Sequence, residues 1–182
     1  AAKSIPGVLD VLAIEQGIAV IASHTHAAVL GRQALQIEWD RGPNAAWTTK
    51  SIDAHLDDRM RQAGVVAQRE GRGVAGLDGA GRILRAEYRL PYLAHAAMEP
   101  GNCTADVRQE GCTIWAPTQS PKRILDSTAR RLGMPAAKIA VNVTLAGGGF
   151  GRRIEDDYAL EAVDLSKAVR RPVQVLWTRE DD

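Results

Sequence analysis

Aromatic residues are scarce in this sequence: they make up 4% of the 182 residues, and phenylalanine occurs once, as Phe150. The two cysteines, Cys103 and Cys112, lie in no metal-binding spacing, so they leave the redox compartment undecided. The net charge is only +1, which gives no indication of binding to nucleic acid or to an anionic membrane surface. No apolar run approaches the roughly 18 residues of a membrane-spanning helix, and no signal peptide is visible.

Hydrophobic residues nevertheless make up 45% of the chain, enough for a core, and the length suits one large domain or two small ones. Strand-like and helix-like patterns are mixed without strict alternation, which predicts an α+β fold of mixed sheets with packed helices. The expected helices are 24–36 (with Ser23 as its N-cap), 51–62, 121–132 and 156–169; the expected strands are 8–14, 18–22, 37–40, 65–67, 82–90, 103–108, 112–115, 141–145 and 173–177. The first two strands are close enough to form a hairpin.

Residues 69–81 hold five glycines and little apolar content, so they predict a linker. This segment includes a literal G-x-G-x-x-G at 71–76. A dinucleotide site would need a helix to open on that motif, and the glycine-rich residues that follow favour a flexible loop instead.

A second glycine-rich stretch stands between an expected strand and an expected helix: Gly147, Gly148, Gly149, Phe150 and Gly151, followed by Arg152 and Arg153. Glycine allows positive φ and close approach of the backbone to a partner. The amides of such a turn can form an anion-binding concavity, to which the arginines add positive charge. We interpret it as a seat for an anionic, phosphorylated cofactor. A tight turn without a ligand is an equally weighted alternative, and the spacing fits neither an ATP nor an NAD site.

Two other candidates have ordinary explanations. Glu99 is an isolated carboxylate in an apolar stretch, which favours a loop side chain that points to water over a carboxylate in a desolvated pocket. His24 and His26 form an H-x-H pair, but residues two apart on a helix do not face each other, so surface or capping histidines are favoured over a metal site.

Three stretches, taken together, carry a family resemblance: 88–100, 115–121 and 147–153. In order and rough spacing they resemble the large subunit of molybdenum hydroxylases of the xanthine oxidase family. The nearest variety is the bacterial isoquinoline 1-oxidoreductase beta subunit with its aldehyde dehydrogenase-like relatives. Residues 4–40 resemble that family's hammerhead domain.

The resemblance implies a hammerhead-like domain over 1–69, a linker over 70–80, and the first part of a molybdopterin-binding domain over 81–182. The chain starts without methionine and ends just after a strand, so we expect a fragment of a longer subunit, on the order of one quarter of it. The whole subunit would be an oxidoreductase that oxidises N-heterocycles or aldehydes with water as the oxygen source. The fragment alone is expected to be inactive.

The resemblance also implies cofactors and partners. The cofactor would be molybdopterin with molybdenum, in either its simple or its dinucleotide form, and the pterin rather than the protein would hold the metal. Electrons would leave through iron–sulfur clusters on a small partner subunit, with a cytochrome c as a further electron acceptor. The other expected partner is the remainder of the large subunit. A bacterial location in the periplasm is favoured slightly over the cytoplasm.

By the same resemblance, Gly147, Gly148, Gly149, Phe150, Gly151 and Arg152 would contact the cofactor. Glu99 would be the catalytic residue, at the substrate side of the metal, and Gln119 would have a packing or pocket-lining role. Two departures stand out. Residues 154–157 lack the arginine that xanthine-oxidising members place there, which argues against purines, and the family's general-base glutamate has no counterpart in the chain.

A free-standing binding or assembly module without catalysis is the alternative. The two hypotheses differ in what they predict for Phe150 and Glu99. In a fragment of the enzyme, these residues should converge on an open, exposed and apolar surface. A self-contained module should bury that surface.

Overall fold

The computed structural model describes residues 1–182, whose contacts define two compact units. Unit 1 comprises Ala1–Leu35 and Tyr92–Asp182, and unit 2 comprises Gln36–Pro91. The strands, all in unit 1, are β1 (Val8–Ile14), β2 (Gly17–Ala22), β3 (Asn102–Val107), β4 (Cys112–Ala116), β5 (Ile139–Val143) and β6 (Val173–Leu176). The helices are α1 (Thr25–Gln33), α3 (Pro121–Leu132) and α4 (Asp157–Val169) in unit 1, and α2 (Thr49–Met60) in unit 2.

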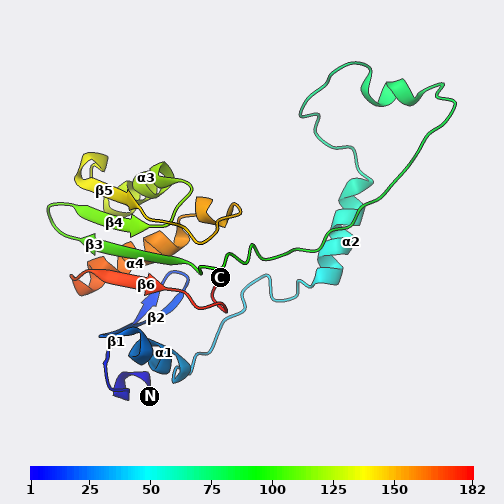
Figure 1. The fold of residues 1–182 in the computed structure, drawn as a ribbon. Coiled ribbons are helices and arrows are strands. Elements are labelled where there is room, and N and C mark those ends of the chain that lie inside the picture. The colour runs from blue at the N-terminus through cyan, green and yellow to red at the C-terminus, as the bar shows by residue number, and fades with distance from the viewer. The chain divides into compact units, whose positions relative to one another are not determined.

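The main sheet of unit 1 has four strands in the order β5-β4-β3-β6 (Figure 1). β3 is antiparallel to both β4 and β6, whereas β4 and β5 are parallel. A parallel pair needs a crossover connection, and α3 supplies it, beginning with Pro121 in its first turn and ending at Gly133 in a left-handed conformation. The mixed sheet with packed helices confirms the predicted α+β class.

The core lies between this sheet and helix α4. Alternate residues of β3 and β4 are buried, as expected for strands with one covered face. They pack with one side of α4 into a single cluster, whose buried members are Cys103, Ala105, Cys112, Ile114, Ala116, Ile124, Ile139, Tyr158, Ala159, Ala162 and Val163. The core therefore supports the middle of the sheet and leaves the strand ends to form a site.

The N-terminal residues form the predicted antiparallel hairpin of β1 and β2, followed by α1. The expected cap was wrong by one residue. His24, not Ser23, is the N-cap, and its Nδ1 accepts a hydrogen bond of 3.2 Å from the amide of Ala27. Ser23 instead donates from its hydroxyl to the carbonyl of Gly7, at 3.3 Å. An imidazole nitrogen thus accepts the capping hydrogen bond that a hydroxyl or carboxylate oxygen usually accepts.

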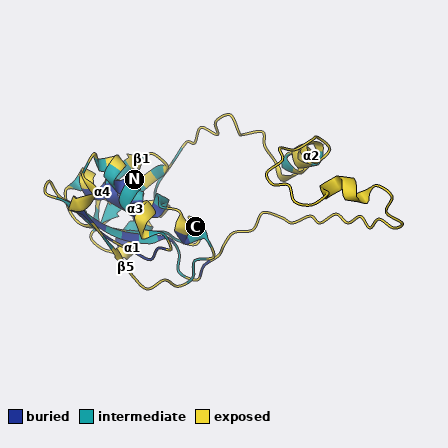
Figure 2. Cartoon of the chain, turned by 90° about the horizontal axis from the view of Figure 1, so that it is seen from above, coloured by how far each residue is buried: buried dark blue, intermediate teal, exposed yellow.

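Unit 2 consists of α2 and long connecting segments. Helix α2 is capped by a reciprocal pair, Thr48 and Ser51, but buries none of its residues. The expected strands at 37–40, 65–67 and 82–90 are wrong, since these residues form no strand. A strand needs a partner to complete its hydrogen bonds, and none is available within this unit. Most of its residues are exposed, as the yellow colouring of Figure 2 shows.

The two units do not coincide with the expected boundaries at 69 and 81. Those boundaries describe domains of a larger subunit and stay a prediction. No helix of the chain combines the length and the apolar character that a membrane crossing requires.

Candidate functional site

Four loops meet at one edge of the main sheet (Figure 1). Because β4 and β5 are parallel, the loops that follow them leave from the same edge. β3 runs the opposite way, so the loop that precedes it also lies there, together with the segment after β6. The carboxyl ends of parallel strands are a common place for ligand sites. The topology therefore brings together the three motifs that are far apart in the sequence.

Glu99 and the glycine turn are in direct contact. The amide of Gly147 donates a 2.6 Å hydrogen bond to Glu99 Oε2, and the amide of Glu99 donates one of 3.2 Å to the carbonyl of Gly147. Asn102 Nδ2 donates to Glu99 Oε1 at 2.8 Å. The Glu99 side chain is 31% exposed. The carboxylate is thus oriented by two fixed donors instead of extending freely into water.

Gln119 holds the other end of the turn. Its Oε1 accepts a 3.2 Å hydrogen bond from the amide of Gly151. A Cβ placed on Gly149 would lie 2.5 Å from that same oxygen, and one placed on Gly147 would lie 2.6 Å from the Cβ of Glu99. Close approach to these two side chains explains why both positions are glycine. Gln119 therefore contacts the turn directly, and it adds a hydrogen bond to the packing or pocket-lining role expected for it.

The turn has positive φ at three residues and is strained at one of them. Gly148 and Gly151 have φ of +105° and +92°, which glycine adopts without cost, but Phe150 has φ of +50°. A bulky residue in the left-handed region is an outlier, and such outliers concentrate at functional sites. Ala96, in the loop before β3, is left-handed too, with φ of +48°. Its neighbour Ala97 lies 3.4 Å from where a Cβ on Gly148 would be, so strained segments face each other across the site.

The site is open and apolar at its surface. The side chain of Phe150 is 72% exposed, and those of Leu145 and Met98 are 97% and 92% exposed. The aromatic ring therefore lies outside the core and near the Glu99 loop, as a fragment of a larger site requires and a self-contained module does not.

Three consecutive amides of the turn have no acceptor in the chain: those of Gly148, Gly149 and Phe150. Unpaired backbone donors need a partner, and successive donors with left-handed residues among them form an anion-binding concavity. These amides suit an oxygen-rich, negatively charged group, which is what the sequence predicted for the turn.

The two arginines after the turn differ completely. Arg152 pairs with both oxygens of Asp157, at 3.0 and 2.7 Å, and its guanidinium lies 5.1 Å from the centre of the Trp177 ring. The hydrogen bonds to Asp157 raise the pKa of Arg152. The charge of Arg152 thus already has a partner within the chain. Its contact with a cofactor stays a prediction. Arg153 is 2% exposed, and the sequence offered no signal to distinguish it from its neighbour.

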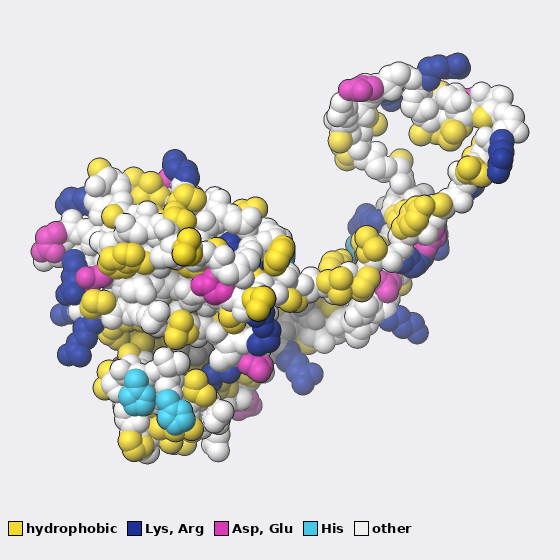
Figure 3. Space-filling view, in the orientation of Figure 1, with side chains coloured by type: hydrophobic (Ala, Val, Ile, Leu, Met, Phe, Trp, Pro, Cys, Tyr) yellow, Lys and Arg dark blue, Asp and Glu magenta, His cyan; other side chains and the backbone are white.

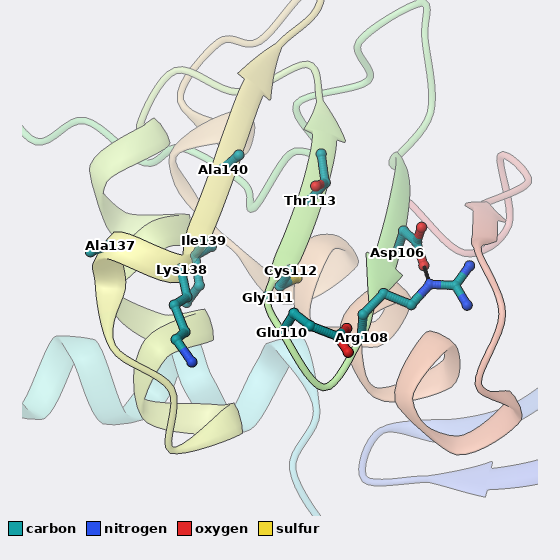
Figure 4. Close-up of a pocket in the computed structure, with 10 residues that line it drawn as sticks. All are labelled: Asp106, Arg108, Glu110, Gly111, Cys112, Thr113, Ala137, Lys138, Ile139 and Ala140. Carbon is teal, nitrogen blue, oxygen red and sulfur yellow. Dashed lines mark ion pairs between the residues drawn. The ribbon is translucent and has the colours of Figure 1, made fainter.

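A separate hollow of about 400 Å³ lies at the opposite edge of the sheet (Figure 4). Its walls come from the β3–β4 turn and from the start of β5, including Arg108, Glu110 and Lys138. Arg108 pairs with Asp106 there, at 2.6 Å. None of the predicted site residues lines this hollow, and its charges of both signs favour no one ligand.

The remaining sequence candidates give no site. The rings of His24 and His26 are stacked with centroids 6.5 Å apart, and no three His, Cys, Asp or Glu side chains gather where they could hold a metal ion. Residues 71–76 run into a short 3-10 turn, Gly73–Leu77, with no buried residue and no α-helix.

Comparisons with known proteins give one family and several relatives of this chain. The model of the molybdopterin cofactor-binding domain matches residues 56–182. Isoquinoline 1-oxidoreductase subunit beta of Brevundimonas diminuta is 28% identical over all of this chain and 25% of its own length. The membrane-bound aldehyde dehydrogenase [pyrroloquinoline-quinone] of Gluconacetobacter polyoxogenes is 32% identical, again over all of this chain and 25% of its own length.

Among solved structures, quinoline 2-oxidoreductase from Pseudomonas putida 86 superposes with a TM-score of 0.71 at 22% identity. The match covers 99% of this chain and 28% of that one, and it shows a shared fold. The chain thus spans about a quarter of the length of these proteins.

Proposed function

Because the chain belongs to the molybdopterin cofactor-binding domain family, we propose that its glycine turn holds molybdopterin with molybdenum in the large subunit of an oxidoreductase. The observation that carries this proposal is the row of three unpaired amides, Gly148 to Phe150, in a strained and open turn. When bound, the cofactor supplies two-electron oxidation of a substrate carbon, with water as the oxygen source.

The residues of the turn divide into two groups by what they contact. The amides of Gly147 and Gly151 donate hydrogen bonds to the side chains of Glu99 and Gln119, which fixes the two ends of the turn. The amides between them would bind the cofactor's oxygens, and the exposed ring of Phe150 would cover its apolar part. The guanidinium of Arg152 lies at the end of the turn that leads into α4. Its positive charge would attract an anion only weakly, because it is already paired with Asp157.

Glu99 is proposed as the substrate-side catalytic residue. A carboxylate has about four acceptor positions. Two are taken by Gly147 and Asn102, so the others can accept a hydrogen bond from a substrate N–H. Because one donor is the backbone amide of Gly147 and the other is the side chain of Asn102 at the start of β3, the carboxylate is held in one orientation before substrate arrives, which is the arrangement that efficient catalysis needs.

The proposed substrates are N-heterocycles or aldehydes. Isoquinoline and aldehyde are the substrate words in the names of the two relatives. Residues 154–157, Ile-Glu-Asp-Asp, place carboxylates where purine-oxidising relatives are expected to carry an arginine, which argues against purines.

The proposed partners are the remainder of the large subunit, a small iron–sulfur subunit and a cytochrome c. Unit 2 supports a covering partner, because it exposes large apolar side chains along and beyond α2 (Figure 3), among them Leu56, Met60, Val65, Leu84 and Leu90. Apolar surface of this extent is typical of a face that another polypeptide covers. We also propose the domain division 1–69, 70–80 and 81–182, and a bacterial periplasmic or cytoplasmic location.

Metal and pterin analysis of the purified native subunit tests the proposal. We expect about one molybdenum and one pterin per chain, and oxidation of an N-heterocycle or aldehyde in which ¹⁸O from labelled water enters the product. A Phe150→Asp variant should lose the cofactor, because the negative charge of the new carboxylate would repel the negatively charged oxygens of the cofactor. A native subunit that is active with a quinone cofactor, or without molybdenum, would overturn it.

A further inference from the structure

Arg153 is the only charged residue among the buried residues of the chain, and it is the largest side chain that is fully buried. Its Nη2 donates to the carbonyls of Glu99 and Pro100, at 2.6 and 2.9 Å. The same nitrogen is 3.6 Å from Glu99 Oε2. The guanidinium therefore holds the backbone and attracts the carboxylate of the loop before β3.

The backbone of Arg153 makes a second set of contacts. Its carbonyl accepts a 3.0 Å hydrogen bond from the amide of Gln119 and one of 3.1 Å from Thr118 Oγ1. Because Arg153 also follows the glycine turn by two residues along the chain, this one position connects the Glu99 loop and the Gln119 loop to the turn.

The pairing of this buried charge is incomplete. Nε and Nη1 of Arg153 have no hydrogen-bond partner, although both are buried. The guanidinium carbon lies 5.3 Å from the centre of the Tyr158 ring, a cation–π contact that offsets part of the cost. Unpaired buried donors destabilise a fold, and replacing a buried charge together with its partner by apolar side chains of similar volume is often neutral or stabilising. Stability alone does not explain an arginine here.

We propose that Arg153 is a positioning residue, which sets the spacing of Glu99, Gln119 and the glycine turn so that the three free amides face one ligand. The proposal rests on the proposed function and adds to it the residue that assembles the seat. A lysine cannot replace it fully, because a single ammonium group lacks the planar fork that spans two carbonyls and stacks on a ring.

The test compares Arg153→Met with Arg153→Lys in the native subunit. Arg131→Met is the matched control, since Arg131 also links separate elements, pairing with Asp164 and Glu15 at the far end of α3. Three quantities are measured: the melting temperature, the molybdopterin content per chain, and the hydrogen–deuterium exchange of a peptide covering residues 144–153.

For Arg153→Met we expect a melting temperature within about 5 °C of the wild type, at least a tenfold faster exchange in the turn, and at least a tenfold loss of cofactor. Arg153→Lys should give exchange rates and a cofactor content between those of the wild type and those of Arg153→Met. Arg131→Met should leave exchange and cofactor content unchanged.

Unchanged exchange in the turn of Arg153→Met would overturn the inference, as would a failure of both Arg153 variants to fold, which would make the residue purely structural. Faster exchange in a subunit that never contained molybdopterin would support the positioning role and reject the proposed function.

Discussion

Glu99 and Gly147 are joined by two hydrogen bonds of opposite direction, one from each amide, although they are 48 residues apart in the sequence. One of these bonds ends on a carboxylate oxygen and is 2.6 Å long. These two hydrogen bonds therefore fix the position of the glycine turn relative to the loop before β3.

Replacement of Glu99 separates its structural and chemical roles. Glu99→Ala removes the acceptor for the Gly147 amide and the Asn102 side chain, so we expect a loss of about 1–3 kcal/mol in the free energy of unfolding. Glu99→Gln keeps an oxygen for Gly147 and should cost less than about 1 kcal/mol. Urea denaturation measures both. If the carboxylate also serves the substrate, Glu99→Gln should still lose activity; an equal loss of stability in the two variants would contradict this account.

The two crowded glycines should respond differently to alanine. A Cβ at Gly147 meets the Cβ of Glu99, which is fixed to the backbone, and Gly147→Ala should destabilise the chain by about 1–3 kcal/mol. A Cβ at Gly149 meets the far end of the Gln119 side chain, which can turn away. Gly149→Ala should therefore cost less than Gly147→Ala, about 1 kcal/mol, which is the hydrogen bond from Gly151 that Gln119 gives up when it turns away. Thermal melts of the two variants and the wild type check this, and a larger loss for Gly149→Ala than for Gly147→Ala would refute it.

Phe150→Gly should raise stability and lower cofactor retention. Phe150 has a left-handed backbone and an exposed ring, so glycine relieves strain without emptying the core. We expect a gain of about 0.5–1 kcal/mol in the free energy of unfolding. Metal analysis should show less molybdenum per chain. A destabilised Phe150→Gly variant would mean that the ring packs against the protein and is not free to contact a ligand.

The two thiols should be inert in the folded chain. Burial raises the pKa of Cys103 to about 12 and that of Cys112 to about 11. A thiol-specific disulfide reagent at pH 8 should therefore label neither cysteine until the chain is unfolded in guanidinium, and then both. Rapid labelling of either thiol in the native chain would contradict the burial.

The same pKa shifts predict the effect of alkali. Because the pKa of each thiol is higher in the folded chain than the ordinary cysteine value of 9.0, the unfolded chain loses these protons first as pH rises. The thiol contribution to stability is thus fully present below about pH 9 and declines through the window up to the folded pKa values. Melting temperatures between pH 8 and 11 should fall less steeply in a Cys103→Ala, Cys112→Ala double variant than in the wild type.

The local order of elements was largely predictable from residue patterns. The hairpin, the crossover helix 121–132 with its proline start and glycine stop, and the helix after the glycine turn all appear within a few residues of their expected bounds. Each depends on neighbours in the sequence, namely periodicity and caps. The strands expected at 37–40, 65–67 and 82–90 failed because a strand also depends on a partner elsewhere in the chain, which a local pattern does not reveal.

For the site, sequence by itself determined that a glycine turn with one phenylalanine stands between a strand and a helix, and which family that turn resembles. Only the tertiary structure decided that Glu99 and Gln119 anchor its two ends, that Arg152 is already paired, and that Arg153 is the buried link. The physical reason is that hydrogen bonds and burial depend on which strand ends share an edge of the sheet, and two adjacent arginines look the same until the fold encloses one of them.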